Sequence, residues 1–185
     1  MSYETAIEIW LRLNRARCPV PQSQDSWRGN TPLPSVVAEF YRCLGPNELF
    51  CFDRMPMKHY FPSLHNLHNL QQTFDTRHWN PNWMVLAHED SNAFVVDLET
   101  HAIIHVKCGA QQLDKFCAFD SISEFMMGIG LLDEFLETPG DDGLLCDIFD
   151  ENDGFHNDCR VGLVKSLSAV ISPASAEQLV ARMFD

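Results

Sequence analysis

The chain has 185 residues, of which 45% are hydrophobic, and a formal net charge of −13 at pH 7. This length and hydrophobic fraction are those of a folded protein with a sizeable core, which excludes a wholly disordered chain. A strongly negative field repels nucleic acid and anionic lipid and attracts basic partners, so the charge argues against nucleic-acid and membrane binding. We therefore expect a single domain, residues 1–185, that binds another protein.

The cysteines and the N-terminal segment predict a cytoplasmic location. Residues 1–18 mix charged and apolar side chains, so they lack the uncharged core of a signal peptide. No apolar run approaches the ~20 residues that a membrane span needs. The absence of any C-x-x-C pair favours reduced, mostly buried thiols over a disulfide framework. The seven cysteines are Cys18, Cys43, Cys51, Cys108, Cys117, Cys146 and Cys159.

Apolar spacing predicts two helices in the first 45 residues. Residues 4–13 place their apolar side chains on one side of a helix. Residues 18–34 are rich in proline and glycine and form a connecting loop, with Trp27 as its one large anchor. A second helix begins at Pro34 and ends at Gly45, where we expect a glycine in the left-handed conformation.

The middle of the chain changes from helix to strand. Leucines three residues apart predict a short helix at 64–70, and three apolar runs at 83–87, 93–98 and 102–106 predict strands joined by tight turns. Residues 116–119 add a fourth strand. These strands describe an antiparallel meander, so the expected fold class is α+β.

The last third of the chain predicts further helices. Ser121 and Glu124 have the spacing of a capping box at the start of one helix. An apolar-periodic run covers 161–171, and a last helix begins at Ser172-Pro173.

The order of these elements resembles the SUKH superfamily, a group that includes fungal cell-wall regulators and many bacterial immunity proteins. The resemblance is strongest over 33–127, and 128–185 is a C-terminal extension packed on that block. The matching segments are Leu33-Pro34, Phe40-Tyr41, Gly45, Leu67 and Leu70, Trp83-Met84-Val85-Leu86-Ala87, Phe94-Val95-Val96-Asp97, Ile103-Ile104-His105-Val106 and Phe119-Asp120-Ser121-Ile122-Ser123-Glu124-Phe125-Met126.

The resemblance implies an antiparallel sheet packed with helices, in a family whose bacterial members mostly bind and block a secreted toxin. It implies no shared catalytic residues. The chain departs from the family at two turns: Asp90-Ser91-Asn92 replaces a Gly-Asp turn, and Thr100-His101 stands where the family favours glycine. Asx and polar residues also form turns, so the fold is compatible with both changes.

Four histidines lie close together in the sequence, and they are the basis of an alternative function. His59, His65, His68 and His78 include one H-x-x-H spacing, so a metal-dependent hydrolase is the alternative from a different functional class. No cysteine pair or H-E-x-x-H motif accompanies them, which favours structural or surface roles. We expect no metal and no cofactor.

Three other groups suggest chemistry without the pattern that it requires. His88-Glu89-Asp90 holds the components of a catalytic triad, but adjacent turn residues cannot converge as a triad must. His101 and His105 can share one face of a strand. Asp150–Gly154 fails the register of an EF-hand loop. We therefore expect no enzymatic activity.

Acidic residues concentrate in a segment that we call the acidic window, residues 133–158. It holds ten acidic residues and no Lys or Arg, so it carries −10 of the net charge of −13, whereas the other 16 acidic residues are nearly balanced by 13 basic ones. A solvated loop is one reading, and a binding surface with apolar anchors among the charges is the other. The candidate partner-binding residues are Asp141, Asp142, Asp147, Asp150, Glu151 and Asp153.

These observations lead to one expected function and one close alternative. We expect an immunity protein that occludes a cognate toxin, with a basic nuclease-type effector as the partner, because nucleases carry positive charge to bind nucleic acid. The alternative is a regulatory or scaffolding SUKH domain that binds an endogenous protein.

Overall fold

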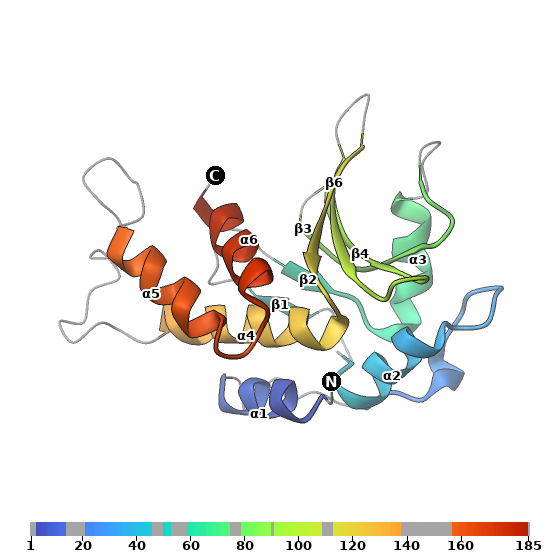
Figure 1. Ribbon diagram of the computed structural model, residues 1–185. Helices are drawn as coiled ribbons and strands as arrows, with labels where there is room; N and C mark the ends of the chain where they lie inside the picture. The colour runs from blue at the N-terminus through green and yellow to red at the C-terminus, as the bar shows by residue number, and fades with distance from the viewer. Residues whose placement is uncertain are drawn as a thin grey trace.

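The computed structural model describes residues 3–13, 21–45, 50–52, 59–74, 79–89, 91–108, 113–137 and 157–184 (Figure 1). Its helices are α1 (Glu4–Leu13), the short 3-10 helix η2 (Gln24–Ser26), α2 (Ser35–Cys43), α3 (Leu64–Phe74), α4 (Ile122–Glu137), α5 (Asn157–Leu167) and α6 (Pro173–Phe184). Its strands are β1 (Phe50–Phe52), β2 (His59–Phe61), β3 (Trp83–Glu89), β4 (Asn92–Asp97), β5 (Ile103–Cys108) and β6 (Leu113–Phe119).

The strands form one antiparallel sheet in which each strand pairs with its neighbours in the sequence. The order is β1-β2-β3-β4-β5-β6, a meander with no crossover. The β3–β4 and β5–β6 pairings are the longest, whereas the described residues of β2 pair with β3 at Tyr60 and His88 alone. The predicted α+β fold, with an antiparallel meander packed against helices, is confirmed.

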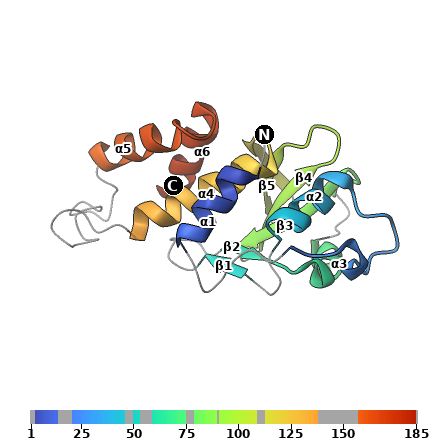
Figure 2. The same ribbon diagram turned by 90° about the horizontal axis from the view of Figure 1, so that it is seen from below.

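The central strands are buried on both faces, which explains their continuous apolar runs. On one side, which we call the α4 face, Met84 and Leu86 of β3 join a large core that includes residues of α1, α2, α4, α5 and α6. On the other side, which we call the α3 face, Trp83 and Val85 join a small core with Phe74 of α3. Figure 2 shows α1 lying along α4 on the first of these sides.

The predicted cap at the start of α4 is confirmed for Ser121, whereas the Glu124 carboxylate binds one residue earlier than in a regular capping box and has a second role. The Glu124 N–H donates to Ser121 Oγ (3.1 Å), and the Glu124 carboxylate accepts from the Asp120 N–H (2.7 Å). The same carboxylate accepts from the Ser172 N–H and from Ser175 Oγ (3.2 Å) at the start of α6. One buried carboxylate therefore joins two helix starts that lie about 50 residues apart in the chain.

The structure corrects the expectation for Gly45 and shows how the Thr100-His101 turn is formed. Gly45 does not adopt a left-handed conformation; a Cβ there would lie 2.6 Å from Tyr41 Cα and 2.5 Å from its ring, so close approach is what requires glycine. His101 is the residue with a left-handed φ, 64°, and its N–H donates to Asp97 O (2.7 Å). Thus His101 occupies a backbone conformation that favours glycine.

Strands β1 and β2 were not predicted. Each has three residues, which is too short to display an alternating pattern. Of the cysteines whose side chains the structure describes, Cys43 and Cys159 are free; the other five lie outside that part of the chain. Within the described residues, none of the helices is both long and apolar enough to cross a membrane.

Candidate functional site

The predicted partner-binding residues lie outside the described residues. Asp141, Asp142, Asp147, Asp150, Glu151 and Asp153 all fall between 138 and 156, as does the loop Asp150–Gly154. This segment joins the last residue of α4, Glu137, to the first residue of α5, Asn157. Both helix ends lie at the end of the molecule that is remote from α2 and α3 (Figures 1 and 2).

Three acidic residues of the window belong to helix α4, and two of them, Asp133 and Glu134, are not available as free surface charges. Asp133 is 7% exposed, which places it in the helix packing rather than on the surface. Glu134 forms an ion pair with Arg12 of α1, with 2.8 Å between Arg12 Nη2 and Glu134 Oε2. A partner-binding surface in this window therefore draws on acidic residues other than Asp133 and Glu134.

The three described histidines of the alternative metal site do not come together. His59 is 2% exposed in β2. His65 is exposed on α3, whereas His68, one turn later, packs edge-on against Trp27 with 6.0 Å between ring centroids. His78 lies outside the described residues. In the described part of the chain, no group of three or more His, Cys, Asp or Glu side chains is arranged to hold a metal ion.

The structure instead places His59 in a buried cluster that could not be predicted from the sequence. Glu89, at the end of β3, lies between two imidazoles: 2.8 Å separate Glu89 Oε1 from His105 Nε2, and 3.3 Å separate Glu89 Oε2 from His59 Nε2. All three side chains are less than 5% exposed. The ring of Phe94 lies 4.8 Å from that of His105 and 5.1 Å from that of His59.

The geometry of this cluster suits a structural role. A buried carboxylate is tolerated when charge or hydrogen bonding compensates for the lost water, and two imidazoles can supply both. Phe94 also stacks on Phe125 of α4, with 4.8 Å between centroids, so the cluster is closed from that side by the large core. It lies on the α4 face of the sheet, covered there by these aromatic rings.

Strand geometry separates the residues of the other two candidate groups. His88 stacks on Tyr60 (5.2 Å) and lies 6.1 Å from Phe74, on the α3 face, whereas its neighbour Glu89 points to the α4 face. The pair therefore cannot form a triad, and Asp90 lies outside the described residues. The expectation that His101 and His105 share a face is wrong, because His101 is exposed in the turn before β5 and His105 is buried.

A groove that the sequence did not predict opens beside the α3 face. It has a volume of about 540 Å³ and lies between the 27–34 loop, α3 and the start of β3. Three tryptophans line it: Trp27, Trp79 and Trp83. The described residues of the lining carry no formal charge and include the neutral polar side chains of Asn30 and Gln72.

Local contacts hold the groove walls in place. The Trp27 ring folds back over Gly29, where a Cβ would lie 2.0 Å from the ring, and Trp27 Nε1 donates to Thr31 O (2.7 Å). At the bottom of the groove Gln71 joins α3 to β3: its amide donates to Val85 O (2.9 Å) and accepts from the Val85 N–H (2.8 Å). The Gln71 amide thus makes the two hydrogen bonds to Val85 that the backbone of a neighbouring strand would otherwise make.

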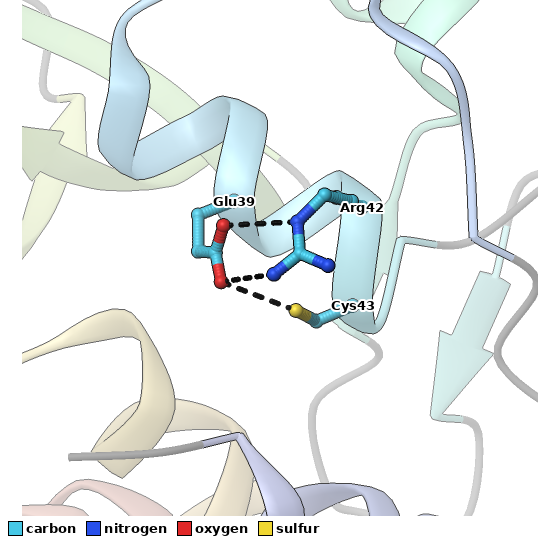
Figure 3. A network of polar contacts seen from close by, with 3 residues as sticks. All are labelled: Glu39, Arg42 and Cys43. Atoms are coloured by element: carbon cyan, nitrogen blue, oxygen red, sulfur yellow. Dashed lines mark hydrogen bonds and ion pairs between the residues drawn. The ribbon is translucent and has the colours of Figure 1, made fainter.

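The exposed side of α2 carries a polar network that is not a reactive site (Figure 3). Arg42 donates to both carboxylate oxygens of Glu39 (3.0 and 2.5 Å), and Cys43 Sγ lies 3.4 Å from one of them. Burial and the hydrogen bond to Glu39 raise the pKa of Cys43 above its ordinary value. The thiol therefore stays protonated at neutral pH, which disfavours a nucleophilic role.

Comparison with known proteins does not identify a family for this chain. No protein-family model matches the chain, and neither the curated proteins nor the solved structures that were searched contain a match. Membership of the SUKH superfamily therefore remains a prediction from the residues and from the order of the elements.

Proposed function

We propose that this protein binds and neutralises a cognate toxin, a basic nuclease-type effector, by covering the surface with which the toxin binds its substrate. The observation that carries the proposal is the charge distribution: −10 of the net −13 lies in residues 133–158, which contain no basic residue. A nuclease surface that binds phosphates must be basic, so a concentrated acidic segment is complementary to it.

The described helices support the location of the binding surface. The −10 includes Asp133 and Glu134, which are used within the fold, one by burial and one by its ion pair with Arg12. The six candidate residues all follow α4 and precede α5, and the end of α4 and the start of α5 lie at the same end of the molecule (Figure 1). Charges close together in the sequence stay near one another in the fold, and a concentrated charge steers a basic partner more effectively than the same charge spread along the chain.

The fold class supports the proposal more generally. A sheet covered by helices on its α4 face gives the acidic segment a rigid support at both of its ends, α4 and α5. A segment fixed at both ends has less chain entropy to lose on binding than a free tail. Occlusion then needs no chemistry from this protein, only a surface that competes with the nucleic acid.

A growth experiment tests the proposal. The protein encoded by the gene beside this one is produced in a bacterial host, alone and together with this protein. We expect the neighbouring protein to stop growth and this protein to restore it. A variant with Asp141→Lys, Asp142→Lys and Asp153→Lys should restore growth poorly. A harmless neighbour, or toxicity that this protein does not relieve, would contradict the proposal and favour an endogenous partner.

A further inference from the structure

The tryptophan groove has the features of a ligand site rather than of unfilled core. Trp83 is 7% exposed, but Trp27 and Trp79 remain partly exposed although each is held by neighbours. Trp79 lies edge-on to Trp83 with 5.7 Å between centroids, and Trp27 lies against His68 of α3. Rigid indole rings around an open volume of about 540 Å³ offer a large apolar contact area at little entropic cost.

The floor of the groove disfavours an added β-strand. Strand addition needs free backbone N–H and C=O groups along a sheet edge. Here both backbone groups of Val85 are bonded to the Gln71 amide, and Trp83 O accepts from Trp79 Nε1 at 3.4 Å. A peptide that depends on backbone pairing would first have to displace these side chains.

The hydrogen-bonding groups that the structure describes along the rim are neutral. Asn30, Thr31 and Gln72 are exposed, and Gln72 Nε2 lies 3.1 Å from His68 Nε2. Stacking sites for nucleic acid combine aromatic rings with cations, and the described lining residues include no Lys or Arg. Amide and hydroxyl donors beside indole rings match a ligand that offers carbonyl groups and apolar rings.

A polyproline II segment offers this combination. It has carbonyl oxygens but few N–H groups, no internal hydrogen bonds, and flat proline rings that pack on aromatic side chains. Its conformation is already ordered before binding, so little entropy is lost. Unlike a β-strand, it makes no demand on the backbone groups of Val85.

The protein already makes one such contact within itself. The Trp27 indole N–H donates at 2.7 Å to the carbonyl of Thr31, the residue before Pro32. The same segment reaches Pro34 with φ −57° and ψ 139°, close to polyproline II values. The wall of the groove is therefore itself an extended proline-containing segment held by an indole.

We propose that the groove binds a proline-rich segment of another protein in the polyproline II conformation. Proline rings lie against Trp27 and Trp79, and the side-chain amides of Asn30 and Gln72 donate to its carbonyls. This site is separate from the acidic window, which joins helix ends at the other end of the molecule (Figure 1). It does not depend on the neutralisation of a toxin.

Decaproline is the probe that tests this proposal. Titration into the full-length protein, followed by calorimetry and by the indole N–H signals in NMR spectra, should give saturable binding with a Kd below ~1 mM. Trp79→Ala should weaken it roughly tenfold or more, and Gln72→Ala severalfold. His65→Ala, an exposed change on the same helix outside the groove, should leave it unaltered.

Because Gln72 is exposed, its variant keeps the test valid even where Trp79→Ala fails to fold. The absence of saturable decaproline binding would overturn the proposal. So would binding that neither groove variant weakens. Maltoheptaose, an uncharged oligosaccharide, serves as the competing ligand: binding of the sugar without binding of decaproline would also overturn the proposal and assign the groove to carbohydrate.

Discussion

The two faces of the sheet are covered to different extents, and this difference separates structural residues from accessible ones. On the α4 face residues of six helices, Leu64 and Leu67 of α3 among them, contribute to one large core, and buried ionisable groups there have partners within the fold, as Glu89 has in His59 and His105. On the α3 face a small core leaves an open groove of about 540 Å³ lined by tryptophans. We therefore infer that the buried His59–Glu89–His105 cluster stabilises the fold. The partly exposed tryptophans of the groove are the side chains that a ligand can reach.

The largest expected effect is the loss of aromatic packing on the α4 face. Phe94 is fully buried and contacts Phe125, His59 and His105, so Phe94→Ala should cost about 3–5 kcal/mol of the free energy of unfolding. Leu70→Ala, a partly buried residue of the α3 face, should cost only about 1 kcal/mol. Urea denaturation measures both, and equal losses would contradict the comparison.

A loss of similar or slightly smaller size should follow removal of the carboxylate in the buried cluster. Glu89→Ala should cost about 3–5 kcal/mol, because it leaves two buried imidazoles without the acceptor between them. Glu89→Gln keeps one acceptor oxygen and should cost less. If Glu89→Ala were as stable as the parent protein in urea, the cluster would have no structural role.

The sequence predicted the elements better than it predicted the contacts between them. The helices at 4–13 and 35–43, the central strands and the Ser121 cap of α4 depend on local patterns, and each was found where expected. β1 and β2 were missed because three residues cannot show a period.

The two sites revealed by the structure depend on residues far apart in the chain. His59, Glu89 and His105 meet because β2, β3 and β5 lie in one sheet with a particular register, which no local pattern specifies. Trp27 joins the groove only because its loop packs against α3. The proline- and glycine-rich composition around Trp27 was the one local signal near the groove. It predicted a loop, but it did not indicate that this loop lines a groove.

A smaller effect is expected at the junction between α4 and α6. Glu124→Ala removes an acceptor from the N–H groups of Asp120 and Ser172, so it should cost about 1–3 kcal/mol. Glu177→Ala, an exposed change on α6, should stay within about 0.5 kcal/mol. Hydrogen exchange should be faster in α6 for the first variant alone; unaltered exchange would mean that Glu124 does not hold α6 on the core.

The smallest effect on stability is expected in the groove. Gln72 is exposed, so Gln72→Ala should change the free energy of unfolding by no more than about 0.5 kcal/mol while it weakens decaproline binding. The matched change Gln71→Ala should be more destabilising, because the Gln71 amide bonds both backbone groups of Val85. Equal losses of stability in the two variants would contradict the assignment of Gln72 to ligand binding and of Gln71 to the fold.

The most direct test of the proposed function measures how fast the toxin associates with this protein as salt is raised. The Asp141, Asp142 and Asp153→Lys variant is compared with a matched reversal of Glu8, Glu99 and Glu177, exposed residues outside the acidic window. We predict that the window variant associates roughly tenfold or more slowly at low salt, and that the difference shrinks as screening shortens to ~8 Å. Equal slowing by both variants, or slowing by neither, would contradict an acidic binding surface between α4 and α5.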